Sequence, residues 1–305
     1  MRRLSEGLIA AVHTPFDASG ALDLAQVERL AAHIAEQDLL GVYVCGSTGE
    51  WSSLSFDERK RLLQRWTQVA RGTPLRVLVH VGSNCLSEAQ ELAQHAERCG
   101  AHGIAALGPF YFKPTSAAVL ADWCAAIAAR APTTPFYYYD IPALSGLSVP
   151  AEEVLERARG RIPTLAGLKL TNTDLARLQR CLELAPGELD VLFGVDALLL
   201  QAWELGVRHA IGGSYAFTAP LYRPLLAAWR HGDHATASDL QRRAARVIAT
   251  VARYDYRAAS KAVMGLLGLE LGPPRPPLVP LTAESTVKLR AELEAQGFLQ
   301  PAAQA

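Results

Sequence analysis

The 305-residue sequence lacks the marks of a nucleic-acid-binding or membrane protein. Its 30 basic residues balance 30 acidic ones and no basic run occurs, so we expect no nucleic-acid partner. The apolar stretches are only as long as strands, which predicts no membrane span. The N-terminal residues 1–6 lack the apolar core of a secretory signal, and we expect a cytoplasmic location.

Cysteine and metal-ligand patterns are also sparse. The five cysteines form no C-x-x-C pair and their number is odd, which predicts free thiols in a reducing compartment. His231 and His234 flank Asp233 at helix-like spacing, but no third ligand signal accompanies them. A surface loop is therefore favoured over a metal site, and no metal is expected.

Short apolar runs do recur, and they alternate with amphipathic helical patterns up to about residue 230. The predicted strands are 7–13, 41–45, 76–80, 103–107, 136–139, 165–170, 191–193 and 210–213. The predicted helices include 23–37, 55–71, 86–99, 116–131, 150–159 and 173–184. Continuous apolar strands are typical of a parallel sheet that is covered on both faces. The pattern predicts a closed (β/α)8 TIM barrel over residues 1–230. An open doubly wound sheet is the alternative, but no G-x-G-x-x-G follows the first strand.

The remaining residues, 231–305, predict a helical C-terminal extension. Helical patterns cover 233–255, 257–267 and 282–296, and a stiff proline-rich segment at 272–277 interrupts them. We expect this extension to pack on the barrel within a single structural domain. The last residues, 301–305, are predicted to form a frayed tail.

One lysine, Lys169, lies inside the apolar run 165–170. Removing an ammonium group from water costs several kcal/mol, so lysine is rarely buried without a partner. A free lysine has a pKa of about 10.4, and desolvation increases the neutral, nucleophilic fraction of such an amine. A neutral amine attacks a ketone carbon and forms a Schiff base. The alternative is a lysine at a strand end whose head group reaches water.

Further polar residues stand where predicted strands end, which is where barrel active sites form. Residues 46–50, Gly-Ser-Thr-Gly-Glu, can present two hydroxyls and backbone N–H groups to a small anion, although a turn with capping hydroxyls is the alternative. His80 ends the third predicted strand and is either functional or a core histidine. The other candidates at strand ends are Tyr139, Thr171, Gly194 and Asp196.

Three of these motifs carry a resemblance. Residues 46–50, the Tyr-x-Ile-Pro of residues 139–142 and the Gly-Leu-Lys-x-Thr of residues 167–171 together resemble the N-acetylneuraminate lyase and dihydrodipicolinate synthase superfamily of class I aldolases. Residues 135–146, 193–196 and 272–274 are most similar to the N-acetylneuraminate lyases. Dihydrodipicolinate synthases typically carry an arginine where Leu144 stands, which counts against that activity.

The resemblance implies a role for each candidate. Lys169 would form the Schiff base with pyruvate or the pyruvyl half of a 2-keto acid, and Tyr139 would be the proton donor and acceptor. Ser47 and Thr48 would hold the pyruvyl carboxylate. The residues facing the hydroxylated tail of the substrate would be Thr171, Gly194 and Asp196. No cofactor is implied, because the iminium itself accepts the electrons of the broken bond.

Two departures from the sialic-acid lyases concern that tail. Ala197 stands where a glutamate is usual, and Gly213 stands where a serine is usual, although Ser214 is adjacent. Removing such partners weakens recognition of substrate hydroxyls. The reaction is therefore expected to be cleavage of a sialic acid or similar 2-keto-3-deoxy sugar acid. The alternatives are an aldolase or dehydratase for a smaller 2-keto-3-deoxy acid, and a non-catalytic barrel that binds a keto acid.

The resemblance also implies an assembly. A homotetramer is expected, with Tyr111 near a subunit boundary, and buried aromatic packing is the alternative for Tyr111. Trp51 either lines the mouth of the site or packs at the start of a helix.

Overall fold

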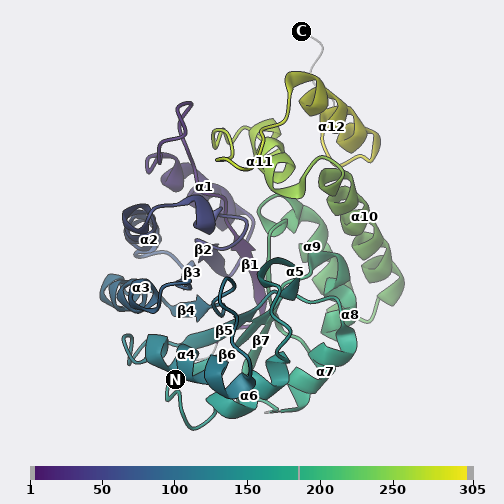
Figure 1. The fold of residues 1–305 in the computed structure, drawn as a ribbon. Coiled ribbons are helices and arrows are strands. Elements are labelled where there is room, and N and C mark those ends of the chain that lie inside the picture. The colour runs from purple at the N-terminus through teal and green to yellow at the C-terminus, as the bar shows by residue number, and fades with distance from the viewer. Residues whose placement is uncertain (1–3, 185, 301–305) are drawn as a thin grey trace.

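The computed structural model describes residues 4–184 and 186–300 and shows a closed barrel of parallel strands (Figure 1). The strands pair in chain order, and the last pairs with the first. They are β1 Gly7–Ala11, β2 Gly41–Val44, β3 Arg76–His80, β4 Gly103–Ala106, β5 Phe136–Asp140, β6 Leu165–Leu170, β7 Asp190–Phe193 and β8 His209–Gly212. The predicted (β/α)8 barrel is confirmed. Several predicted strands extended too far, because the residues after β1, β2 and β4 already belong to the loops.

Helices surround this barrel. They are α1 Gln26–Glu36, α2 Phe56–Ala70, α3 Leu86–Cys99, α4 Ala117–Ala128, α6 Ala151–Ala158, α7 Leu175–Glu183, α8 Leu199–Glu204 and α9 Tyr215–Arg230. Shorter helical segments occupy three of the loops, namely Trp51–Ser53, α5 Pro142–Ser145 and Asp196–Leu198. The capping box predicted at Ser55 and Glu58 is present at the start of α2. None of the helices in the described ranges is long and apolar enough to cross a membrane.

Helix α9 was not predicted, because it contains Pro220 and Pro224. A proline has no N–H to donate to the carbonyl four residues earlier. In the structure, the carbonyl oxygen of Ala216 lies 2.6 Å from Nε2 of His33, which donates a hydrogen bond in place of the missing N–H of Pro220. A side chain from α1 therefore allows the helix to continue.

Two apolar clusters explain why the strands are apolar along their whole length. The larger one lies between the sheet and the helices and extends under the C-terminal helices. The smaller one fills the barrel interior and includes Ile9, Tyr43, Leu78, Tyr139 and Ile211. Both faces of each strand are therefore covered, as the sequence pattern indicated.

The C-terminal helices lie against one side of the barrel, where Figure 1 shows them in green to yellow. They are α10 His234–Ala252, α11 Tyr256–Leu266 and α12 Ala283–Ala295. Helix α10 packs on α9, and α12 packs on both α10 and α11. The predicted helical patterns correspond to these three helices. The tail predicted at 301–305 lies outside the described residues.

A bulge in β6 sets the position of the strand that carries Lys169. Phe136 pairs with Leu165 and Tyr137 pairs with Gly167, so that Ala166 is one extra residue in β6. Gly167 has φ +152°, and a Cβ atom there would lie 1.9 Å from the carbonyl oxygen of Asp190 on the neighbouring strand. Only glycine allows this backbone conformation at this separation from β7.

Replacing this glycine tests the requirement. Gly167→Ala is expected to lower the free energy of unfolding by about 2–4 kcal/mol, through backbone strain and the clash with β7. The matched control is Gly160→Ala, where φ is +78° but no atom lies within 4 Å of the added carbon. The free energy of unfolding of that control should fall by about 1 kcal/mol, because only the strain of a non-glycine residue at positive φ applies there. Urea unfolding of both variants measures the difference, and equal losses would contradict the role of the close approach.

Candidate active site

The side chain of Lys169 lies inside the barrel at the C-terminal end of β6. Lys169 is 4% exposed, and its Nζ donates a hydrogen bond to Oγ1 of Thr171 at 3.1 Å. The same nitrogen lies 3.8 Å from the ring centre of Tyr139 and 5.3 Å from that of Tyr43. No carboxylate among the described residues is within ion-pair distance of it. One hydroxyl and two aromatic faces therefore hold this amine, and its head group does not reach the outer surface.

Tyr139 is directly beside the lysine, because the two residues pair across β5 and β6. Its hydroxyl lies 3.4 Å from Oγ of Ser47. Its ring makes edge contacts with Tyr43, at 6.0 Å between centroids, and with His80, at 5.6 Å. A buried tyrosine in contact with rings on two sides has little rotational freedom, so its hydroxyl stays beside Ser47 in the cavity.

The loop of residues 46–50 forms another wall of the site. Both glycines are required by close contacts: a Cβ at Gly46 would lie 2.7 Å from the ring of Tyr43, and one at Gly49 would lie 3.0 Å from the carbonyl oxygen of Val12. Thr14 Oγ1 donates a hydrogen bond of 2.6 Å to the carbonyl of Gly49. These contacts fix the loop so that its two hydroxyl residues line the cavity.

The opposite wall is less polar than the resemblance to sialic-acid lyases implied. The carboxylate of Asp196 accepts hydrogen bonds from the backbone N–H of Ser214, at 2.8 Å, and from its Oγ, at 2.5 Å. Burial raises the pKa of Asp196, and these two bonds act in the opposite direction. Ser214 is thus committed to Asp196 and does not replace the serine that is absent at Gly213.

Two glycines of this wall lie so close to neighbouring side chains that no larger residue fits there. A Cβ at Gly194 would lie 2.2 Å from Oγ1 of Thr171, and one at Gly213 would lie 2.8 Å from Oγ1 of Thr48. Tyr256 Oη would be only 3.1 Å from the same added carbon of Gly213. A tyrosine from α11 therefore stands next to the place where a serine side chain would be.

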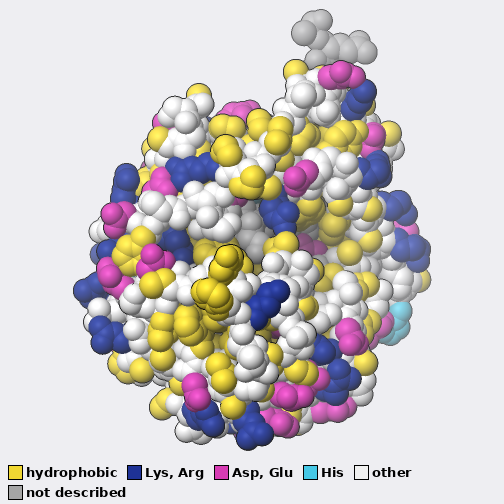
Figure 2. Space-filling model, viewed as in Figure 1, with side chains coloured by type: hydrophobic (Ala, Val, Ile, Leu, Met, Phe, Trp, Pro, Cys, Tyr) yellow, Lys and Arg dark blue, Asp and Glu magenta, His cyan; other side chains and the backbone are white. Residues whose placement is uncertain are grey.

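All of the predicted site residues line one cavity of about 450 Å³ at the C-terminal ends of the strands. They are Ser47, Thr48, Tyr139, Lys169, Thr171, Gly194 and Asp196. A second cavity of about 330 Å³ adjoins it and shares four lining residues, namely Ser47, Ile141, Leu144 and Arg257. Figure 2 shows a hollow near the middle of the visible face, with Lys or Arg side chains close to it.

The sequence did not predict the part of the site that comes from the C-terminal helices. Ile248 of α10 and Tyr256, Arg257 and Ser260 of α11 line the main cavity. The pattern of the sequence predicted these helices but not which side chains reach the barrel mouth. An arginine and a tyrosine at the start of a helix carry no signal for that contact.

The sequence left alternatives open for Trp51, His80 and Tyr111, and the structure shows where each of them lies. Trp51 both lines the second cavity and packs edge-on against His80, with 5.0 Å between the ring centroids. Burial lowers the pKa of His80 well below its ordinary value, and its Nδ1 lies 3.2 Å from the carbonyl of Ala105. Tyr111 is 78% exposed and Phe112 is 85% exposed, so buried packing within the chain is wrong for Tyr111.

The described residues hold no group of three or more His, Cys, Asp or Glu side chains placed to bind a metal ion. His231 ends α9 and His234 begins α10, and both are exposed. The five cysteines are free, as the sequence predicted, and Cys85 is the exposed one.

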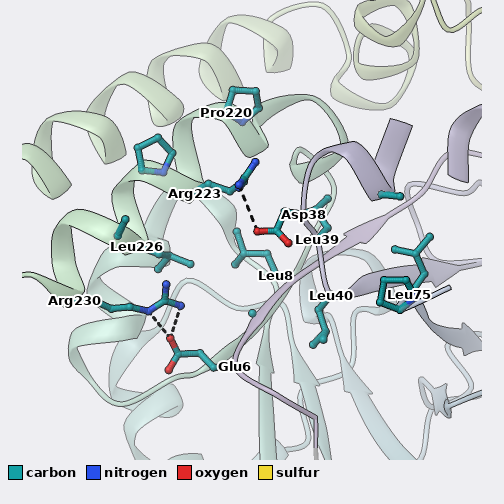
Figure 3. A pocket seen from close by; sticks show the side chains of 15 residues that line it. Glu6, Leu8, Asp38, Leu39, Leu40, Leu75, Pro220, Arg223, Leu226 and Arg230 are labelled. Atoms are coloured by element: carbon teal, nitrogen blue, oxygen red, sulfur yellow. Dashed lines mark hydrogen bonds and ion pairs between the residues drawn. The ribbon is translucent and has the colours of Figure 1, made fainter. Parts of the chain in front are cut away.

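A larger hollow, about 680 Å³, lies at the other end of the barrel (Figure 3). Its charged side chains pair with one another: Arg230 contacts Glu6 at 2.6 Å, and Arg223 contacts Asp38 at 3.4 Å. It lies where β1 begins, and none of the residues at the C-terminal ends of the strands line it. The N-terminal end of a TIM barrel serves stability rather than chemistry, so size does not make this hollow the active site.

Comparisons with known proteins identify the family of the chain. A model of the "Dihydrodipicolinate synthetase family" matches residues 4–296. The chain is 38% identical over 297 residues to the N-acetylneuraminate lyase of Gallus gallus, with 96% of each chain covered. It is 36% identical over 298 residues to that of Homo sapiens, covering 96% of this chain and 93% of the human one.

Solved structures give the same result. The N-acetylneuraminate lyase of Proteus mirabilis aligns with a TM-score of 0.93 at 37% identity, covering 96% of this chain and 99% of that one. The sialic acid aldolase of Aliivibrio salmonicida aligns with a TM-score of 0.94 at 37% identity, covering 98% and 99%. The chain belongs to the dihydrodipicolinate synthetase family.

Proposed function

We propose that the chain is a pyruvate-dependent class I aldolase, a carbon–carbon lyase. It reversibly cleaves a sialic acid or a similar 2-keto-3-deoxy sugar acid to pyruvate and an aldehyde. The observation that carries the proposal is the amine of Lys169, buried beside the ring of Tyr139 in a cavity lined by Ser47 and Thr48. Relatives named N-acetylneuraminate lyase at 36–38% identity support it.

The first half of the mechanism forms the Schiff base. The Nζ of Lys169 attacks the keto carbon, and the adduct loses water to give an iminium. The hydroxyls of Ser47 and Thr48, with the N–H groups of their loop, donate hydrogen bonds to the adjacent carboxylate. This places the keto carbon above the amine, which replaces a bimolecular encounter with a positioned one.

The second half breaks the carbon–carbon bond. Tyr139 takes the proton of the hydroxyl on the carbon beyond the breaking bond while its own phenolic proton passes to Oγ of Ser47, 3.4 Å away, and from Ser47 to the carboxylate that this serine holds. The carbon beyond the bond then leaves as an aldehyde. The electron pair of the broken bond enters the iminium and leaves an enamine. The enamine carbon takes the proton back from Tyr139 by the reverse of this relay, and water then hydrolyses the iminium to release pyruvate and free Lys169.

A smaller substrate is the second candidate, because the tail region offers few groups for sugar hydroxyls. Ala197 and Gly213 present no polar side chain, and Ser214 is bonded to Asp196. Each absent hydrogen bond to an uncharged hydroxyl weakens binding by about 0.5–1.5 kcal/mol. A 2-keto-3-deoxy acid aldolase or dehydratase for a shorter tail fits this wall.

We also propose a homotetramer, built as a pair of dimers with Tyr111 near a subunit boundary. The two exposed rings of Tyr111 and Phe112 contact each other edge-on, with 5.1 Å between centroids, and directly follow Phe110, which lines the second cavity. The free thiols fit a reducing cytoplasm, which is the location that we propose.

Trapping with borohydride tests the Schiff base. Pyruvate with borohydride is expected to add a pyruvyl-derived mass to Lys169, and Lys169→Ala should abolish both labelling and turnover. Lys113→Ala is the control and should label normally. Peptide mass spectrometry locates the adduct, and an adduct confined to another lysine would refute the assignment.

Tyr139→Phe tests the proton transfer. The variant should still form the pyruvate imine but should cleave substrate about 10²- to 10⁴-fold more slowly, the usual contribution of a positioned acid or base. The matched control is Tyr138→Phe, because Tyr138 is buried on the outer face of the same strand and its hydroxyl has no partner. Stopped-flow pyruvate release compares them. Similar rates for the two variants would place the proton transfer elsewhere.

Light scattering tests the assembly. At micromolar concentration the wild-type chain should scatter as a tetramer, and Tyr111→Ser with Phe112→Ser should shift the mass toward smaller species. The loss of two apolar rings from an interface weakens association. A wild-type monomer would contradict the proposal.

A further inference from the structure

Arg257 is a cation at the mouth of the site whose charge no residue of the protein uses. It lines both the main cavity and the adjoining one. Within residues 4–184 and 186–300, its guanidinium makes no hydrogen bond or ion pair. Two other partly or fully buried arginines do have partners: Arg59 donates to the carbonyls of His80 and Gly82, and Arg275 pairs with Glu58.

The acidic residues near Arg257 are committed to other partners. The two acids that line the cavities are Glu50, which pairs with Lys261, and Asp196, which accepts from Ser214. Asp255 caps α11 by accepting a hydrogen bond from the backbone N–H of Arg257 at 3.2 Å, and its carboxylate lines neither cavity. The guanidinium therefore faces open space without a counter-charge from the wall.

The backbone of Arg257 is fixed, so its position is a built feature. Its carbonyl accepts a hydrogen bond of 3.0 Å from Oγ of Ser260. The same Ser260 Oγ lies 2.9 Å from Nε2 of buried His13. Burial lowers the pKa of His13 to about 3, so this histidine is neutral and does not compete for an anion. The start of α11 is thereby attached to the end of β1.

The rest of the tail region contrasts with this cation. Its wall includes the small or apolar residues Val195, Ala197, Ile211 and Ile248, with Asn172 and Thr173 as polar groups. The pyruvyl end already has its own groups in Ser47, Thr48 and Lys169. A charge on the far half of the substrate would meet Arg257 and no other cation that lines these cavities.

We propose that Arg257 binds an anionic group, a carboxylate or a phosphate, on the aldehyde half of the substrate. This inference rests on the proposed function and favours, within it, the 2-keto-3-deoxy acids that carry a second anion over N-acetylneuraminate, whose aldehyde half is neutral. The guanidinium fork matches both anions with two parallel hydrogen bonds. A neutral aldehyde leaves the cation unpaired, which is the source of the discrimination.

The test compares neutral and anionic acceptors in the condensation with saturating pyruvate. One pair is glyceraldehyde and glyceraldehyde 3-phosphate, and the other is butanal and succinate semialdehyde. In at least one pair, the wild-type kcat/KM should favour the anionic member by about ten- to a hundredfold. Arg257→Gln should remove that preference by lowering kcat/KM for the anionic member, and Arg257→Lys should keep part of it.

Arg223→Gln is the matched control. It removes the same charge at the opposite end of the barrel, so any effect of net charge on encounter rates appears there as well. The phosphate pair and the carboxylate pair show which anion is preferred. A wild-type enzyme without preference in either pair, or a preference that survives Arg257→Gln, would overturn the proposal.

Binding without chemistry separates this proposal from the aldolase assignment. Calorimetry with glycerol 3-phosphate and with butyrate needs no Schiff base, and Arg257→Gln should weaken binding of the favoured anion about tenfold or more. Failure of borohydride trapping would refute the aldolase, whereas equal anion binding by wild type and Arg257→Gln would refute the role of Arg257.

Discussion

A buried ion pair between Glu50 and Lys261 joins the loop after β2 to helix α11 of the C-terminal extension. Glu50 Oε1 lies 3.1 Å from Lys261 Nζ, and the two side chains are 3% and 2% exposed. Burial lowers the pKa of Lys261 to about 8, although Glu50 acts in the opposite direction. Breaking a buried pair from one side costs about 3–5 kcal/mol, so neither partner is dispensable alone.

This pair fixes more than its own two residues. Glu50 is the last residue of the loop that presents Ser47 and Thr48, and its Oε2 also accepts the backbone N–H of Arg275 at 2.7 Å. Arg275 in turn pairs with Glu58, which caps α2. The C-terminal extension is thus clamped onto the loop after β2. The position of α11 over the cavity follows from this clamp.

The two halves of the cavity follow different physical rules. Around Lys169 the groups are fixed by strand register, by ring contacts and by glycines that no larger residue can replace. The tail half is formed by loops after β7 and β8 and by α11, where the polar groups are few and Asp196 is already bonded. The barrel strands therefore fix the groups around Lys169, and the extension contributes side chains to the tail half of the cavity.

The sequence by itself determined the barrel, because strands covered on both faces are apolar along their whole length. It also singled out the polar residues at the ends of these strands, which converge in a barrel, namely Lys169, Tyr139, Ser47 and Thr48. It could not indicate that Ser214 is bonded to Asp196, that α9 continues through Pro220, or that Arg257 reaches the cavity. Those facts depend on contacts between residues far apart in the chain or on the direction in which one side chain points. Local periodicity carries no information about either, so only the tertiary structure decided them.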